Sequence, residues 1–557
     1  MIATLKNLRL YWHTILHLRP IQIYGRIRYR LTNPKVDGSA APGVRTATDC
    51  WIRSAKRNVS MTGPESFLFL GEAGNLEKDG WDNVSRTKLW RYNQHYFDDL
   101  NGFEAEVRAE WHSELVGRWI ADNPPPAEGI GGTGWEPYPT SLRIVNWIKW
   151  VRSGGNLSAS ALQSLAVQVR WLSKRLEWHI LGNHLFVNAK ALIFAASFYD
   201  GPEAEQWLTV GADILLSKGE IAEQILEDGG QFELSPMYHL LAVEDLLDIL
   251  NALRSVSGSW TDFGERIANK LILAAELRLP SMLGWMQVMA HPDDKISFFN
   301  DSAFGVAPEL SEIKRYAEAL GFVSNLALGE TTHLQSSGYA RLETGPAVLL
   351  TDFARVGPDY LPGHAHADTL SFELSLYGKR VFVNSGTSVY GVSSERLRQR
   401  GTAAHNTVVV KGMDSSEVWS GFRVARRAQV TEIDVAKIEG ALTAKATHDG
   451  YRRLPDGPYH TRYWVLGAGQ LFVKDFLSSS SEAEARYHLH PEAEIFKDGL
   501  LILPGGQKAR WQSEGGAVRV EQSSWHPEFG VSRPNQCLVV PLKNGYGSLR
   551  LTWVDAN

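Results

Sequence analysis

The sequence predicts two segregated domains, an all-α array followed by an antiparallel β-sandwich. Up to about residue 325, apolar residues recur at helical spacing, and from about residue 335 they alternate with a period of two. Because helices come first and strands afterwards, we expect the two kinds of element to form separate domains. The boundary is expected near 325–340, which gives a helical domain at 1–330 and a β-sandwich at 331–557.

The helical half is predicted from segments of hairpin length that Gly and Pro pairs separate. In 161–176, five apolar residues fall on one face at helical spacing: Leu162, Leu165, Ala166, Val169 and Leu172. Further segments of this kind are 184–198, 237–253 and 262–277. Such a run of helices favours an all-α array of the toroid kind.

The second half is predicted from short alternating segments. Residues 369–377 alternate, Gly378-Lys379 is typical of a turn, and 380–383 continue as a partner strand. Further strand candidates are 406–410, 428–433, 463–465, 471–476, 518–520 and 549–553. Many short strands separated by turns favour an antiparallel sandwich.

Composition excludes several classes of protein. The 557 residues hold 57 Lys and Arg against 62 Asp and Glu, a balance unlike that of a dedicated nucleic-acid binder. Two cysteines, Cys50 and Cys537, exclude a disulfide framework and a cysteine-rich zinc module. No uncharged apolar run reaches the ~18 residues of a transmembrane helix. The 19 tryptophans are expected to fill cores first and to stack on sugars second.

Residues 1–35 form a basic amphipathic segment. Residues 1–30 carry no acid and six cations: Lys6, Arg9, Arg19, Arg26, Arg28 and Arg30. Apolar residues at helical spacing are Leu5, Leu8, Trp12, Ile15 and Leu16. His13, His17 and Arg19-Pro20 interrupt the pattern of a secretory signal, so no signal peptide is expected. We expect a helix packed on its own domain; the alternative is peripheral contact with a membrane surface or an anionic polymer.

The strongest local motif is Gly363-His364-Ala365-His366-Ala367-Asp368, directly before 369–377. In an extended segment, His364, His366 and Asp368 would project to one side. With a third imidazole at His405, His364 and His366 would form a three-ligand zinc site or a proton-transfer site. The alternative is a surface strand edge with hydrogen-bonded histidines.

Two motifs begin predicted helices in the first half. Asn183-His184 opens one helix, where Asn183 also fits an N-cap. Tyr238 follows Ser235-Pro236, a favoured helix start, and Glu227-Asp228-Gly229-Gly230 forms the preceding turn. The alternatives are capping for Asn183, capping or packing for His184 and a core position for Tyr238.

Aromatic and cationic residues elsewhere are candidates for substrate binding. Trp135 could stack on a sugar ring, and Arg355 and Arg398 could bind carboxylates through paired hydrogen bonds. Packing of Trp135 and solvation of both arginines are the alternatives. The same two options apply to Arg396, Arg400, Tyr390 and Trp419.

Together and in this order, these motifs resemble the heparinase II/III-type polysaccharide lyases, with alginate lyases as more distant relatives. The resemblance rests on Asn183-His184, Tyr238 after 227–229, Gly363–Asp368 with 370–373, and 404–407. Their combined order is specific, whereas each motif alone is not. The resemblance implies an incomplete α/α toroid followed by an antiparallel β-sandwich. It also implies β-elimination on a uronic-acid-containing anionic polysaccharide, which leaves 4,5-unsaturated uronate ends.

The resemblance further implies a role for each residue. Asn183, with His184 beside it, would neutralise the uronate carboxylate, because an ionised carboxylate disfavours a carbanion at C5. Tyr238 would act as general acid, and in syn elimination also as base, for which a nearby donor or cation must lower its pKa. His364 would be the base for the other epimer, so the site would lie between the two domains.

A zinc ion under this site is also implied by the resemblance. His366 and His405 match two of its ligands, but the position of the third, an Asp, falls on Asn384. Because zinc favours Cys, His and carboxylate ligands, metal binding stays open. Either Asn384 coordinates through its carbonyl oxygen, or the site retains a hydrogen-bond network without metal.

Two other functions stay open at this point. A metal-dependent glycan hydrolase would use His364, His366 and His405, with Asp368 or Glu373 activating water. A non-catalytic polysaccharide-binding or assembly protein would use the same scaffold without turnover. Without a signal peptide, the expected location is the cytoplasm or, by another export route, the bacterial cell envelope or periplasm.

Overall fold

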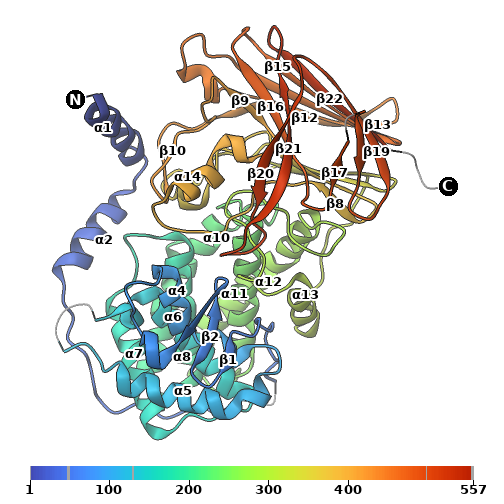
Figure 1. The fold of residues 1–557 in the computed structure, drawn as a ribbon. Coiled ribbons are helices and arrows are strands. Elements are labelled where there is room, and N and C mark those ends of the chain that lie inside the picture. Colours follow the sequence, from blue (N-terminus) through green and yellow to red (C-terminus); the bar gives the residue numbers. More distant parts are fainter. Residues whose placement is uncertain (1, 47–49, 128–130, 497, 554–557) are drawn as a thin grey trace.

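The computed structural model describes residues 2–46, 50–127, 131–496 and 498–553, with side chains from residue 8 onward. The chain forms an incomplete α/α toroid followed by an antiparallel β-sandwich (Figure 1). The helices of the first half are α1 (Ile2–Ile15), α2 (Pro20–Leu31), α3 (Leu76–Asp79), α4 (Lys88–Tyr96), α5 (Ala109–Asp122), α6 (Pro137–Arg152), α7 (Ala159–Lys174), α8 (Gly182–Phe198), α9 (Pro202–Ala212), α10 (Glu220–Gln224), α11 (Pro236–Arg254), α12 (Asp262–Val288) and α13 (Leu310–Ala319).

The toroid has an inner and an outer layer of helices. The inner helices α6, α8 and α11 are buried on nearly every side, and α8 contacts α6, α7, α9 and α11. Every residue of α8 from Leu185 to Phe198 is buried, as expected of a helix that is apolar all round. The outer helices α7, α9 and α12 each bury one face. The inner helices thus carry their N-terminal residues to the rim of one central space.

Within the described residues, the strands form five antiparallel sheets. Their bounds are β1 (Met61–Gly63), β2 (Ser66–Phe69), β3 (Glu72–Asn75), β4 (Thr331–Leu334), β5 (Tyr339–Thr344), β6 (Ala347–Asp352), β7 (Phe372–Leu376), β8 (Lys379–Phe382), β9 (Val408–Val410), β10 (Val418–Trp419), β11 (Arg423–Val424), β12 (Val430–Ile438), β13 (Ala441–His448), β14 (His460–Gly467), β15 (Gln470–Leu477), β16 (Ala483–His488), β17 (Glu494–Ile495), β18 (Leu500–Ile502), β19 (Lys508–Glu514), β20 (Arg519–Trp525), β21 (Arg533–Pro541) and β22 (Tyr546–Trp553).

The sandwich is built mainly from three of these sheets. Their strand orders are β4-β5-β6-β7-β8, β12-β13-β14-β15-β22-β19-β18-β17 and β20-β21-β16-β9. Alternate residues of β14 are buried, so one face of its sheet covers the sandwich core. The short helix α14 (Ser394–Arg400) lies in the long connection between β8 and β9. This connection and the one before β7 carry the predicted histidines.

One predicted strand begins later than expected. Residues 369–377 alternate in sequence, but β7 begins at Phe372 because Leu370 has a left-handed backbone, with φ of 61°. His364 ends a 3₁₀ turn at Pro362–His364, and His366 and Asp368 follow in a loop. The expectation of one extended segment that projects three side chains to one side is therefore wrong.

A buried apolar cluster joins the two halves. Trp285 and Met289 from the end of α12 and the residues after it pack with Tyr339 and Leu350 of the first sandwich sheet. The residues that follow α12 then run among the loops and strands of the sandwich, where Asn300 donates its backbone N–H to Asp368. The halves therefore share a core.

The N-terminal helices extend along one edge of the molecule, from the sandwich to the toroid (Figure 1). Thr14 of α1 accepts a hydrogen bond from the indole of Trp419, and Gln22 of α2 donates to the carbonyl of Tyr360. The segment thus packs on its own domain through α2, as expected, but it also contacts the sandwich half, which was not expected. Among the described helices, none combines the length and apolar character needed to cross a membrane.

Candidate active site

A cavity of about 1360 Å³ lies where the toroid, the sandwich and the N-terminal helices meet. Asn183, His184 and Tyr238 line it from the toroid, and His364 and Tyr390 line it from the sandwich. The structure thus brings all four predicted catalytic residues to one space between the halves. Ligand sites are often found in such interdomain clefts.

The start of α8 directs two polar side chains into this cavity. Leu181 and Gly182 both have left-handed backbones, with φ of 67° and 57°, so the chain turns sharply into the helix. The N-cap is Leu181 and provides no side-chain hydrogen bond, so Asn183 is not the cap that its sequence position allowed. The half-buried amide of Asn183 has no hydrogen-bond partner among the described residues and is free to bind a ligand.

His184 is held in place beside Asn183. Its Nδ1 donates to Glu177 Oε1 over 3.0 Å, and its ring lies 4.4 Å from that of Tyr138. Burial lowers the pKa of His184, but the Glu177 carboxylate outweighs burial, so the pKa lies above its usual value. The imidazole can therefore carry positive charge at the cavity wall.

Tyr238 lies in the first turn of α11, which Ser235 caps by accepting the Tyr238 backbone N–H. Its hydroxyl lies 3.2 Å from that of Tyr390, and its ring centre is 4.0 Å from that of His364. Burial, followed by the influence of Tyr390, raises the pKa of Tyr238 well above its usual value. This direction is opposite to the lowering that a base role would require, so the Tyr238 hydroxyl stays protonated at neutral pH.

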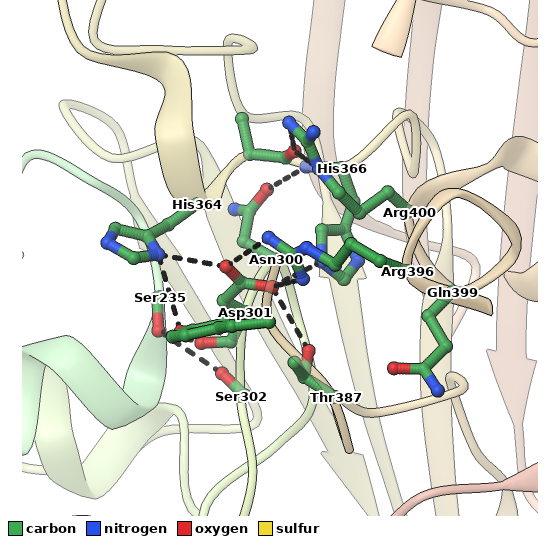
Figure 2. A network of polar contacts seen from close by, with 12 residues as sticks. Ser235, Asn300, Asp301, Ser302, His364, His366, Thr387, Arg396, Gln399 and Arg400 are labelled. Carbon is green, nitrogen blue, oxygen red and sulfur yellow. Dashed lines mark hydrogen bonds and ion pairs between the residues drawn. The ribbon is translucent and has the colours of Figure 1, made fainter. Parts of the chain in front are cut away.

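His364 is oriented by a buried carboxylate. Its Nδ1 donates to Asp301 Oδ2 over 2.8 Å, which leaves Nε2 to face the cavity (Figure 2). Asp301 also accepts hydrogen bonds from Arg396, His366 and Thr387. Burial raises the pKa of Asp301, but Arg396 outweighs it and holds the pKa well below its usual range. Asp301 therefore stays ionised.

A second carboxyl group faces His364 from the toroid. Glu233 is buried, and its Oε2 lies 3.7 Å from His364 Nε2 with no hydrogen-bond partner in the described part of the chain. Burial raises the pKa of Glu233 above its usual value. An unpaired buried acid at a cavity wall is the kind of group that binds a ligand or transfers a proton.

Below His364, three residues form a potential metal-binding cluster. His366, Asp368 and His405 are buried, and their potential ligand atoms all lie within 4.8 Å of one another. His366 Nδ1 and His405 Nε2 are 3.3 Å apart, close to the ~3.3 Å edge of a tetrahedron with zinc–nitrogen bonds of ~2.0–2.1 Å. Burial lowers the pKa of His366 and lowers that of His405 to about 4, so both rings are neutral, as metal ligands must be.

Asn384 is not the third residue of this cluster, because its amide is engaged elsewhere. Its Oδ1 accepts the Asn406 backbone N–H, and its Nδ2 donates to Ser371. The carboxylate beside the two histidines is instead Asp368, only two residues after His366. The cluster of His366, Asp368 and His405 therefore fits zinc better than the predicted set of His366, Asn384 and His405, because it contains a carboxylate.

The three predicted substrate-binding residues lie outside the cavity lining. Trp135 is 3% exposed and packs against Trp119 and Trp171 in the toroid core. Arg398 pairs with Glu395 at the surface, and Arg355 lines a separate pocket of about 430 Å³. The expectation that these three contact a substrate in the same cleft is not supported by their positions, because local composition does not indicate which way a side chain points.

Sequence reasoning also missed residues that the structure places at the site. No motif in the sequence singles out Asp301, Glu177 or Glu233, and Arg396 is expected to bind substrate or to be solvated at the surface. A signal for Asp301 is the polar run Asn300-Asp301-Ser302 directly after two buried phenylalanines. Its partners lie about 60 to 95 residues away, so pattern alone does not identify them.

Comparisons with known proteins agree with this architecture. Residues 83–324 match the model of the heparinase II/III N-terminus, and 327–553 match that of the heparinase II/III-like C-terminal domain. A heparin-sulfate lyase of Bacteroides stercoris is 29% identical over 259 residues, which are 42% of this chain and 37% of that protein. One of Bacteroides thetaiotaomicron is 25% identical over 369 residues, covering 59% and 51%. The matched regions thus span about half or less of these relatives.

Solved structures share the fold. A crystal structure of heparinase III has a TM-score of 0.67 at 16% identity and covers 96% of this chain and 89% of that one. A heparan sulfate lyase from Pedobacter heparinus has a TM-score of 0.53 at 17% identity, with 96% and 88% covered. These similarities extend over both halves of the molecule.

Proposed function

Because the chain belongs to the heparinase II/III-like family, we propose that it is a polysaccharide lyase that cleaves a uronic-acid-containing anionic polysaccharide by β-elimination. The observation that carries the proposal is the convergence of Asn183, His184, Tyr238 and His364 on one cavity. This set provides donors for a carboxylate, one proton acceptor and one proton donor. The heparin-sulfate lyase relatives support a glycosaminoglycan-like substrate.

The first requirement of elimination is a more acidic C5 proton. The free amide of Asn183 and the imidazolium of His184 would bind the uronate carboxylate and neutralise its charge. Negative charge that develops at C5 can then spread onto that carboxylate. Glu177 supports this role because it raises the pKa of His184 and so favours the imidazolium.

The second requirement is transfer of two protons. His364 Nε2 would take the C5 proton, because Asp301 fixes the other ring nitrogen as a donor. Tyr238 would give its hydroxyl proton to O4 as the C4–O4 bond breaks and the C4–C5 double bond forms. The raised pKa of Tyr238 favours this division between an acid and a separate base. Glu233, which faces His364 Nε2, would receive or relay the proton afterwards.

Tyr238→Phe tests this assignment directly. We expect loss of activity by at least ~100-fold, since general acid catalysis contributes ~10²–10⁴. The measurement is ultraviolet absorbance of the unsaturated uronate product on a panel of uronate polysaccharides that includes heparan sulfate. Tyr199→Phe is the matched control, because Tyr199 is buried in the toroid core, bonded to Leu162, and should retain activity.

Two other outcomes would indicate a function other than β-elimination. New reducing ends without unsaturated product would indicate hydrolysis by the histidine cluster. Polymer binding without product, unchanged in Tyr238→Phe, would indicate a binding or assembly protein.

We also propose that His366, Asp368 and His405 hold a zinc ion, which would fix the loop beneath His364 and add positive charge there. We expect about one zinc per chain by elemental analysis of the purified protein. Asp368→Asn and His405→Ala should lose the metal. Asn384→Ala should keep it, because the Asn384 amide is engaged with Asn406 and Ser371. Metal loss in Asn384→Ala but not in Asp368→Asn would contradict this ligand set.

A further inference from the structure

The N-terminal helices expose an unusual amount of apolar surface. Trp12 is 62% exposed, Tyr24 61% and Leu31 79%. Further large apolar side chains of this segment that are at least one-third exposed are Leu8, Tyr11, Ile15, Leu16, Leu18, Ile21, Ile23 and Ile27. Single exposed apolar residues are common, but a contiguous patch of this kind marks an interaction surface.

These side chains form a stripe on each helix. On α1, Leu8, Trp12, Ile15 and Leu16 recur at spacings of four, seven and eight and therefore share one face. On α2, the corresponding stripe is Ile23, Tyr24, Ile27 and Leu31. Gln22 and Gly25 are the buried residues of α2 and lie on the opposite face. The apolar stripe of α2 thus lies away from the face that Gln22 and Gly25 bury, and its residues Ile23 and Ile27 border the cavity.

Both helices are fixed to the body of the protein on their other faces. A Cβ added at Gly25 would lie 2.9 Å from the backbone nitrogen of His179, so α2 packs directly on toroid backbone. Arg19, between the helices, forms an ion pair with Glu223. These contacts hold the stripe in a defined position on the protein.

The charged side chains that α1 and α2 themselves carry are all positive. The first acid in the sequence is Asp37, so α1 and α2 hold none. Arg9, Arg26, Arg28 and Arg30 form no ion pair with any described residue, whereas Arg19 is paired. At helical spacing, Arg26 and Arg30 flank one side of the α2 stripe and Arg28 the other.

We propose that α1 and α2 dock on the surface of an anionic lipid bilayer. An apolar stripe between arginines is the arrangement of a helix that lies in the membrane interface, with its apolar face among acyl chains and its cations at anionic headgroups. The charge is complementary to such a surface over the whole segment. Aromatic Trp12 and Tyr24 suit the headgroup level.

Docking through this stripe would also determine which way the cavity faces. Ile15, Leu18, Ile23 and Ile27 also line the cavity, so its rim would face the bilayer. If the proposed lyase activity holds, its substrate would be an acidic glycan held at or near the membrane. This consequence rests on the proposed function, whereas docking itself does not.

Vesicle co-sedimentation of the full-length protein tests docking without reference to activity. The probes are vesicles of phosphatidylcholine alone and of phosphatidylcholine with about 30% phosphatidylglycerol. We expect at least ~10-fold stronger binding to the anionic vesicles, and a loss of most of that preference between ~0.1 M and ~0.5 M salt. Failure to bind anionic vesicles at the lower salt concentration would overturn the proposal.

Matched variants identify the surface. Trp12→Glu and Tyr24→Glu should each lower vesicle binding at least ~10-fold, because a carboxylate opposes both insertion and the anionic headgroups. Neither residue lines the cavity, so activity on a soluble polymer should be unchanged. The control is Leu277→Glu on α12, which is 71% exposed and should leave vesicle binding unchanged.

Light scattering tests the alternative that a second copy of the chain covers the stripe. A protein that is dimeric in solution, becomes monomeric in Trp12→Glu and does not bind vesicles would show that a second copy covers the stripe, and docking on lipid would be wrong. Equal loss of vesicle binding in Leu277→Glu would also contradict the assignment. If the protein shows no lyase activity on any polymer but binds anionic vesicles, the proposed function is wrong and the docking proposal stands.

Discussion

Several polar atoms of cavity-lining residues make no hydrogen bond within the described part of the chain, and two of them lie at or beside the predicted catalytic residues. The Asn183 amide is half-buried and free, and Glu233 Oε2 is fully buried and unpaired. Leaving a buried polar group without a hydrogen bond costs roughly 1–3 kcal/mol. A ligand that hydrogen-bonds to these groups would remove this cost, so both atoms mark the part of the cavity where the proposed substrate would bind.

His184 predicts the pH dependence of the proposed reaction. Its pKa is raised by Glu177, so the imidazolium is present below that pKa and is lost as pH rises through it. We therefore expect kcat/KM to fall as pH rises through the raised pKa, which gives the pH–rate profile a descending alkaline limb. His184→Gln should remove this limb. Glu177→Gln should move the limb to lower pH, because burial then acts without the opposing carboxylate.

The pH–rate profile of each variant measures this effect. His333→Gln is the control, since His333 lies on β4 outside the cavity lining and should leave the profile unchanged. A limb at the same pH in Glu177→Gln as in the wild type would contradict the role of the Glu177–His184 pair.

The candidate site was only partly predictable from sequence. Asn183, Tyr238 and His364 were proposed because their motifs resemble those of a known family, and the structure places them at one cavity while their roles stay predictions. Asp301 was missed because its function depends on tertiary contacts with His364 and Arg396. Trp135 was misassigned because its aromatic ring serves the core equally well, and Arg355 and Arg398 because composition does not show which surface a side chain faces.

At the scale of elements, periodicity predicted which segments are helices better than where they end. The segment 262–277 lies within α12, but the helix continues to Val288, past Pro280. Proline normally disrupts a helix interior. Here Trp285 and Val288, which follow it, are buried in the cluster between the halves, and this packing keeps the last turns helical. Tertiary burial is not visible in a local pattern.

The packing of α2 predicts the effect of a small change at Gly25. Alanine favours a helix over glycine by ~1 kcal/mol, but here its Cβ would meet His179 backbone at 2.9 Å. We expect Gly25→Ala to loosen α2, so that amide hydrogen exchange within 20–31 becomes faster while exchange in α8 is unchanged. Hydrogen exchange by mass spectrometry measures both.

Gly117→Ala in α5 is the matched control. No atom lies within 4 Å of its added Cβ, so the substitution should slow exchange locally. If Gly25→Ala also slowed exchange in α2, the close approach to His179 would not limit the helix.

At the scale of the whole molecule, the two halves are joined by buried polar contacts as well as by the shared core. His291, just after α12, bonds Ser375 and Glu373 of β7, each over 2.8 Å. Ten residues later, Asp301 binds Arg396 and both histidines of the 364–366 loop. The domain division expected at 330 therefore separates kinds of secondary structure, while the Asp301–His364 hydrogen bond crosses it.

This coupling predicts that the halves unfold together. We expect scanning calorimetry to give one transition, with equal calorimetric and van't Hoff enthalpies. Asp301→Asn should move that single transition down, because it leaves Arg396 buried without its counter-charge, a loss of about 3–5 kcal/mol in the free energy of unfolding. Glu395→Gln is the control, since the Glu395–Arg398 pair is exposed and such pairs contribute about 0–1 kcal/mol. Two resolved transitions in the wild type, or equal shifts in both variants, would show that the network does not couple the domains.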